Sequence, residues 1–179
     1  MTETPELTIY EKTFAKSDKT NAILVVQGKK LHVNKTLLSL HSDFFDTLFN
    51  SEFKEKAIEE IDIKDVKFED FATLLSLIHP NPLKPTEFNA EKLLELADRL
   101  LMTSVKQQLE WFLITTNISR FTKLRIADKY QLDDLLQNAI DRIVKSDGFL
   151  TISNSNTFTN LSDKNKVKLL MHLLAANNQ

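Results

Sequence analysis

The chain has 179 residues, of which 42% are hydrophobic and 27% are charged, and it contains no cysteine. Its 25 acidic and 23 basic side chains give a formal net charge of -2, so no overall field attracts nucleic acid or an anionic membrane surface. The absence of cysteine excludes disulfides, thiolate zinc sites and cysteine nucleophiles. No secretory signal and no long apolar run occur, so we expect an intracellular protein, cytoplasmic or nuclear, with no membrane or nucleic-acid partner.

The first third of the chain predicts a small sheet followed by two short helices. "AILVVQGKKLHV" indicates a strand at 22–27, a tight turn at Gly28 and Lys29, and a second strand at 30–33. Asn34 and Ser42 are good helix caps, and each precedes a short apolar segment. The second segment places large apolar side chains on two neighbouring helical faces, so we expect it to be buried on most sides: Phe44, Phe45, Leu48 and Phe49.

The next elements are a strand and a long series of helices. "AIEEIDI" has β character, and Asp65 is expected to cap a helix that ends by His79, before Pro80. Its apolar residues fall on one face: Phe68, Phe71, Leu74, Leu75 and Ile78. From residue 89 onward the spacing predicts only helices, arranged as two hairpins with a tight connection at Gln131 in the second. A final helix, capped by Ser162 or Asp163, is expected to present Val167, Leu170, Met171 and Leu174.

The search for chemistry in the sequence finds no catalytic, cofactor or metal site. The four histidines lack metal-ligand spacing, and two glycines cannot build a phosphate-binding loop. Asp133 and Asp134 stand at a predicted helix start, where carboxylates favour the helix dipole. These acids, with Asp141, would also repel DNA phosphates from the second predicted helical hairpin.

Phe53 differs from the other aromatic residues because charged residues surround it. Its neighbours are Glu52, Lys54, Glu55 and Lys56, which indicates that this segment is exposed to solvent. An aromatic side chain in such a setting is typical of an anchor for another protein. The alternative is that Phe53 folds back onto the core.

Several motifs follow one another within residues 19–116: the "GKK" turn, "LHVNKTLL", "HSDFFDTLF", "EIDIKDV" and "LLELADRLLMTSVKQQLEWFL". In this order they resemble the BTB/POZ domain family. The following "ISRFTKLRIADKYQLDDLLQNAIDRI" resembles the helical 3-box, or truncated BACK extension, of cullin-3 adaptors. The resemblance implies an α+β fold, a small mixed sheet capped by helical hairpins, with an all-helical extension at 117–179. Residues 1–18 would then be an N-terminal segment with a possible dimerisation helix.

Family membership implies a non-catalytic interaction module that homodimerises and recruits a cullin-3-type scaffold. It would act as a substrate adaptor of a ubiquitin ligase complex, for a protein substrate that the sequence does not identify. The family's apolar-x-Glu cullin signature matches Phe53, Lys54 and Glu55, and further cullin contacts would map to Asp46, Phe49, Leu101 and Met102. The dimer interface would involve Tyr10, Phe14, Leu37, Leu38 and Phe44.

The sequence also departs from the family pattern. Repressor-type domains pair an Asp with a Lys or Arg, whereas this chain has Asn21 and keeps Lys35. His79, Pro80 and Asn81 replace the usual aromatic-Thr-Gly. A dimerising scaffold or transcriptional cofactor that does not bind cullin therefore stays as the alternative. Since no kelch repeat, zinc finger or MATH-like sandwich is present, either the chain is a fragment or substrates bind these domains directly.

Overall fold

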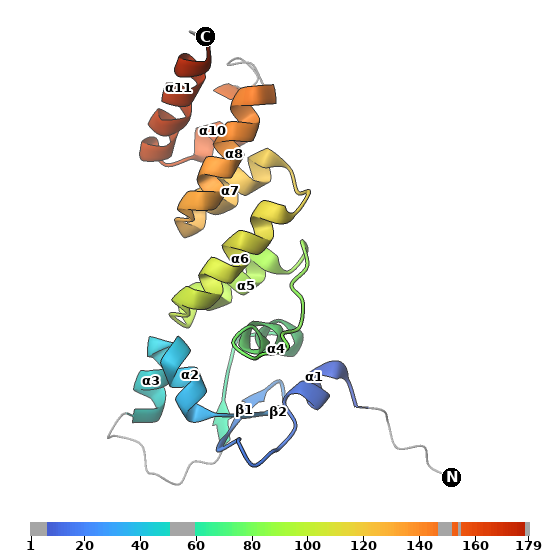
Figure 1. The fold of residues 1–179 in the computed structure, drawn as a ribbon. Helices are drawn as coiled ribbons and strands as arrows, with labels where there is room; N and C mark the ends of the chain where they lie inside the picture. Colours follow the sequence, from blue (N-terminus) through green and yellow to red (C-terminus); the bar gives the residue numbers. More distant parts are fainter. Residues whose placement is uncertain (1–6, 51–59, 147–151, 154, 178–179) are drawn as a thin grey trace. The chain divides into compact units, whose positions relative to one another are not determined.

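The computed structural model describes residues 7–50, 60–146, 152–153 and 155–177. The chain forms two compact units that divide between Lys106 and Gln107, within one helix (Figure 1). The elements of unit 1 are α1 (Ile9–Thr13), β1 (Ala22–Val26), β2 (Lys29–Val33), α2 (Lys35–His41), α3 (Asp43–Asn50), β3 (Glu60–Asp62), α4 (Phe68–Ser76), α5 (Ala90–Arg99) and the first turn of α6 (Thr103–Thr115). Unit 2 contains the rest of α6 with α7 (Arg120–Tyr130), α8 (Asp133–Ser146), α10 (Asn156–Asn160) and α11 (Asp163–Asn177).

A three-stranded mixed sheet lies in unit 1, with β1 at its centre. Strand β1 pairs antiparallel with β2 and parallel with β3. The hairpin turn consists of Gln27 and Gly28, both with positive φ (51° and 76°), because Val26 pairs with Lys29. Two positive φ angles are typical of a type I′ turn, whose twist matches that of the strands. The predicted α+β class is confirmed, but the turn lies one residue earlier than predicted.

Helix α4 is capped from a distant part of unit 1. The predicted cap at Asp65 is wrong, because the helix starts at Phe68 and Asp65 takes a left-handed φ of 61°. Instead, the Phe68 N–H donates to the Gln27 side-chain oxygen at 3.0 Å, so the hairpin turn satisfies a free donor of the helix. The helix is also buried on nearly every side rather than on one face: Phe68, Phe71, Ala72, Thr73, Leu74, Leu75 and Ser76.

Helix α1 and its C-terminal cap residue, Phe14, pack aromatic side chains onto the rest of unit 1. Thr8 and Glu11 form a reciprocal capping box at its start. Tyr10 meets the Phe68 ring edge-on at 6.0 Å, and the buried Phe14 meets the His79 ring at 5.4 Å. Burial lowers the pKa of His79, which favours the neutral ring beside Phe14. Phe14 therefore belongs to the core of unit 1.

Two buried charged side chains connect the helices of unit 2. The Lys123 side chain on α7 is fully buried, and its ammonium donates to the Ile114 carbonyl at 2.8 Å and the Thr116 carbonyl at 2.9 Å. The buried Glu110 on α6 accepts the Leu135 N–H at 2.9 Å, in the first turn of α8. Each charge thus satisfies backbone groups at a helix end, where intrahelical partners are missing.

The outer helices of unit 2 agree only in part with the sequence analysis. The tight connection after α7 is confirmed, since Gln131 takes a left-handed φ of 55° and returns its N–H to Ala127. Helix α11 presents, as exposed side chains, three of the apolar residues that the sequence analysis singled out: Val167, Met171 and Leu174. The residues that it buries, Leu169 and Leu173, were not singled out.

We expect Lys123→Met to lower the free energy of unfolding by about 1–3 kcal/mol, because both carbonyls lose a buried donor while helix propensity hardly changes. Chemical denaturation followed by circular dichroism measures this loss. Lys164→Met, on the exposed side of α11, is the control and should change stability by less than about 0.5 kcal/mol. Equal stability of the two variants would contradict the role of the Lys123 ammonium.

Candidate protein-binding surface

The buried Ser42 hydroxyl joins two corners of unit 1 that are 58 residues apart in the chain. It donates to the Leu100 carbonyl at 2.6 Å and accepts the Phe45 N–H at 3.1 Å, so it caps α3 and holds the end of α5. Beside it, the His41 ring nitrogen Nδ1 lies 3.1 Å from the Ser104 hydroxyl. The α2–α3 corner and the α5–α6 corner are therefore fixed side by side.

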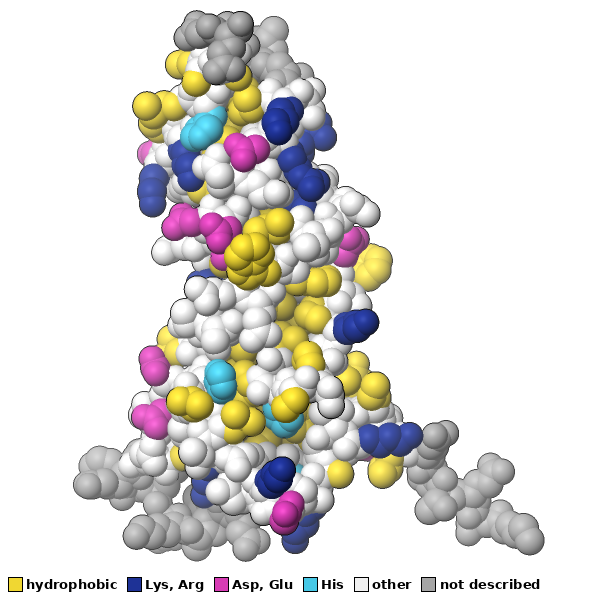
Figure 2. All heavy atoms as spheres, in the orientation of Figure 1, with side chains coloured by type: hydrophobic (Ala, Val, Ile, Leu, Met, Phe, Trp, Pro, Cys, Tyr) yellow, Lys and Arg dark blue, Asp and Glu magenta, His cyan; other side chains and the backbone are white. Residues whose placement is uncertain are grey.

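Exposed hydrophobic side chains flank this junction. Leu40 is 77% exposed, Leu101 is 55% exposed and Phe44 is 37% exposed. Leu101 directly follows Leu100, and its left-handed φ of 53° lets the next residue return its N–H to Ala97 at 2.8 Å. With the exposed acids Asp43 and Asp46, these residues form what we term the α3 surface. Figure 2 shows acidic side chains over α3 next to hydrophobic side chains over α2.

Helix α3 is less buried than its aromatic content predicts. Only Phe45 is fully buried, and it stacks on the half-buried Phe49 with ring centroids 5.7 Å apart. The Lys35 ammonium lies 5.7 Å from the Phe49 ring centroid, on the flank of the helix. Phe44 meets Phe45 edge-on at 5.3 Å but keeps part of its ring in solvent. The expectation that this helix is buried on most sides is therefore wrong.

The predicted cullin-contacting residues have different environments. Phe53, Lys54 and Glu55 lie outside the described residues. Asp46 is exposed and accepts a hydrogen bond from the Asn50 side chain at 2.7 Å. Leu101 is exposed, whereas Met102 is fully buried and belongs to the core.

The residues predicted for the dimer interface are mostly covered by unit 1 itself. Phe14 and Leu38 are buried, Tyr10 and Leu37 are half-buried, and only Phe44 is exposed. The sequence reasoning missed Leu40, Leu7 and Ile9, which are all exposed. Helical periodicity could have identified Leu40. A residue two positions after the buried Leu38 lies on nearly the opposite face of the helix, so Leu40 is expected to be exposed.

The Asn21 and Lys35 positions take a structural role at the start of α2. The Asn21 side-chain oxygen accepts the Lys35 N–H at 2.8 Å. Asn34 caps the same helix by accepting the Leu37 N–H at 2.9 Å, as predicted. In repressor-type domains an Asp and a Lys or Arg would form a charged pair at these positions. Here the neutral Asn21 amide instead accepts a hydrogen bond from the Lys35 backbone.

Among the residues that the structure describes, no group of three or more His, Asp and Glu side chains could hold a metal ion. Within the same part of the chain, no helix is both long enough and apolar enough to cross a membrane. The exposed chemistry of the α3 surface consists of apolar side chains and carboxylates, which suits contact with another protein.

Residues 10–117 match the family model described as "BTB/POZ domain". The chain belongs to the BTB/POZ domain family. It is 37% identical to BTB/POZ domain-containing protein Y57A10B.3 of Caenorhabditis elegans, over 92% of this chain and 52% of that protein. It is 36% identical to BTB and MATH domain-containing protein 38 of the same organism, over 84% of this chain and 39% of that protein. Kelch repeat and BTB domain-containing protein 1 of cowpox virus (strain Brighton Red) is 24% identical over 82% of this chain.

The chain therefore contains a protein–protein interaction module, the BTB domain, and the α3 surface lies within it. The chain spans about half, or less, of the length of the relatives named first. The similarity to them covers 166 and 152 residues, so it extends beyond the BTB match into the helical extension.

We expect Ser42→Ala to lower the free energy of unfolding by about 1–3 kcal/mol, because the buried Leu100 carbonyl and the Phe45 N–H both lose a partner. Thermal and urea unfolding of the purified variant measure the change. The control is Thr47→Ala, which removes an exposed hydroxyl from the same helix and should cost less than about 0.5 kcal/mol. A Ser42 variant as stable as the Thr47 variant would show that the junction holds without this hydroxyl.

Proposed function

We propose that this BTB protein is a non-catalytic adaptor that recruits a cullin-3-type scaffold, and with it a ubiquitin-transfer machinery, to a protein substrate. One observation carries the proposal: the Ser42 hydroxyl holds α3 and the Leu101 corner together as a single exposed surface. These are two regions in which the family's cullin contacts are expected.

The chemistry of the α3 surface supports contact with a scaffold that has an apolar groove and basic side chains. Phe44 and Leu101 can bury apolar area in the partner, as the anchors at the centre of protein interfaces do. Asp43 and Asp46 stand beside them, where charges accelerate association and select the partner. The scaffold would therefore contact a small hydrophobic centre with an acidic rim.

The adaptor is also proposed to form a homodimer through the outer face of α1. Tyr10 and Phe14 fix this helix to the rest of unit 1, while Ile9, and Leu7 just before the helix, remain exposed. A second copy could cover both residues in a two-fold symmetric contact, which is the common form of dimer interface. Residues 1–18 would then supply the dimerisation element, 19–116 the BTB body and 117–179 a 3-box or BACK-like extension, in the cytoplasm or nucleus.

The adaptor proposal predicts that Asp46→Lys and Leu101→Ser each weaken binding of the cullin-3 amino-terminal domain by about tenfold or more, which is about 1.4 kcal/mol. Both side chains are exposed, so neither change should alter the melting temperature by more than a few degrees. Isothermal titration calorimetry gives the affinities.

Matched controls are Asp18→Lys and Phe88→Ser, which alter an exposed acid and a 99% exposed aromatic elsewhere in unit 1. Both should bind like the wild type. If the wild-type chain does not bind the cullin domain, the adaptor role is wrong, and a dimerising scaffold or transcriptional cofactor becomes the better description.

For the dimer, light scattering at micromolar concentration should give twice the chain mass of 20.6 kDa. Ile9→Lys places a charge in the proposed contact and should reduce the mass to that of one chain, because an unpaired buried charge is costly. Lys12→Glu changes an exposed charge on the same helix and is the comparison. A wild-type mass of 20.6 kDa would refute the dimer without affecting the cullin assay.

A further inference from the structure

The segment between α4 and α5 contains three of the four prolines of the chain, and the proposed adaptor function does not use it. It reads "PNPLKP" over residues 80–85, and Figure 1 shows it as an extended trace that joins the two helices. Pro82 is exposed and Pro85 is half-buried. We term residues 82–86 the proline segment. It follows a bend at residues 79–81 and ends at the turn that precedes α5.

Local rules restrict the backbone of the proline segment to a narrow range. A proline holds its own φ at about −65°, and the residue before a proline is restricted to extended conformations. Pro82 and Pro85 carry the first restriction, and the residue before each carries the second. Leu83 lacks both, but its N–H donates to the buried Ser76 hydroxyl at the end of α4, at 3.0 Å. These restrictions favour the polyproline II conformation.

The C-terminal end of the proline segment is fixed by a reciprocal pair of hydrogen bonds. The Thr86 N–H donates to the Asn89 side-chain oxygen at 2.7 Å, and the Asn89 N–H donates to the Thr86 hydroxyl at 3.3 Å. Phe88 stands within this turn and is 99% exposed. The segment is therefore held at both ends before any partner arrives, so binding would cost little conformational entropy.

We propose that the proline segment is the docking site for a proline-recognition domain of a partner protein, a domain whose groove is lined by aromatic side chains. Polyproline II has three residues per turn, so Pro82 and Pro85 face the same side. This P-x-x-P spacing is the one that such grooves accept. Lys84 is exposed and forms no ion pair with any residue that the structure describes, so an acid at the groove's edge can pair with it. Phe88 adds an aromatic contact just beyond the segment.

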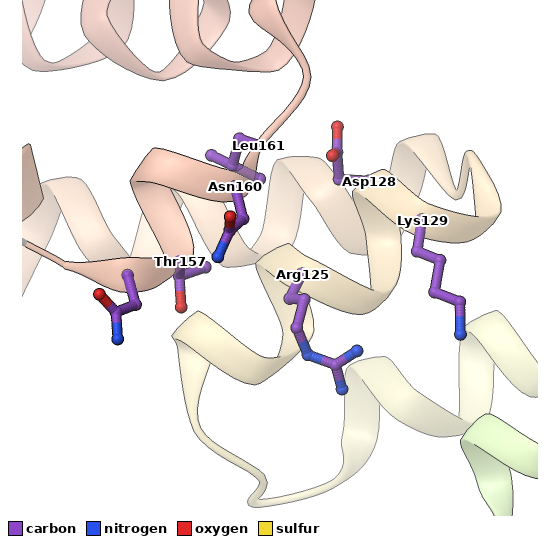
Figure 3. A pocket seen from close by; sticks show the side chains of 7 residues that line it. Arg125, Asp128, Lys129, Thr157, Asn160 and Leu161 are labelled. Atoms are coloured by element: carbon purple, nitrogen blue, oxygen red, sulfur yellow. The ribbon is translucent and has the colours of Figure 1, made fainter.

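The charged side chains around the hollow between α7 and α10 are, in contrast, already engaged (Figure 3). Arg125 interacts within the chain, and the Lys129 ammonium lies 4.7 Å from the Tyr130 ring centroid. Asp128 accepts the Ser162 N–H at 2.9 Å. These contacts occupy the groups within unit 2, whereas the exposed side chains of the proline segment remain accessible.

The proline segment is separated from the α3 surface by the length of α5. This helix has 10 residues, so its ends are about 15 Å apart. The proline segment precedes the helix, and Leu101 of the α3 surface follows it. A domain bound to the segment would therefore give the protein a second partner, beyond cullin recruitment and independent of it.

The test uses the full chain and an array of purified SH3, WW and EVH1 domains, which are classes that bind polyproline II ligands. At least one domain should bind, and isothermal titration calorimetry then gives its affinity for each variant. The combined variant Pro82→Ala and Pro85→Ala should lose at least tenfold, and Lys84→Glu and Phe88→Ser should each lose at least threefold. Pro5→Ala and Lys16→Glu, which change a proline and an exposed lysine elsewhere, are the controls and should bind like the wild type.

Amide spectra of the ¹⁵N-labelled wild-type chain give a readout that needs no substitution. The bound domain should shift the amide signals of Leu83, Lys84 and Phe88. The proposal is overturned if no domain of the array binds, if the double proline variant binds as the wild type does, or if these signals stay in place. A change in the light-scattering mass of the double variant alone would also overturn it, because the segment would then contact a second copy of the chain. Cullin affinity should be unchanged in every variant of the segment, so this test is separate from that of the adaptor role.

Discussion

The α3 surface of unit 1 depends on the hydrogen bonds of one group, the Ser42 hydroxyl. A helix N-terminus and the end of another helix both carry backbone groups without intrahelical partners, and one hydroxyl can both donate and accept. Ser42 uses this double capacity to cap α3 and to hold the Leu100 carbonyl. The left-handed Leu101 then projects outward while Met102 enters the core. Exposed apolar side chains from two distant segments thereby share one surface.

In unit 2, charged side chains rather than a hydroxyl satisfy the backbone groups that lack partners at helix ends. The Lys123 ammonium satisfies carbonyls at and just after the end of α6, and the Glu110 carboxylate accepts an N–H from the start of α8. Asp128 does likewise at the start of α11. Each charge has the sign that its helix end favours, so the electrostatic and hydrogen-bonding contributions reinforce each other. Each of these contacts involves few residues, yet it fixes the position of one helix against its neighbour.

Features decided by neighbouring residues could be predicted from the sequence, and features decided by distant contacts could not. The Asn34 and Ser42 caps and the Gln131 connection follow local rules and are confirmed. The cap of α4 comes from Gln27, 41 residues away, and no local pattern reveals it. For α11, two apolar stripes compete, and helical periodicity does not tell which one packs inward. In the candidate site, Leu101 and Asp46 are exposed as a contact role requires, but the burial of Met102 depends on a strained turn at Leu101.

The burial of Lys123 also has a chemical consequence. Acylation of a lysine, whether by a reagent or by an enzyme that transfers ubiquitin or acetate, requires a neutral amine that can approach an electrophilic carbon. The Lys123 nitrogen is enclosed and engaged with two carbonyl oxygens, whereas lysines such as Lys16 and Lys164 reach solvent. The exposed amines are therefore open to acylation, whereas the amine that holds the end of α6 is shielded. Modification at Lys123 would accordingly report that unit 2 had opened.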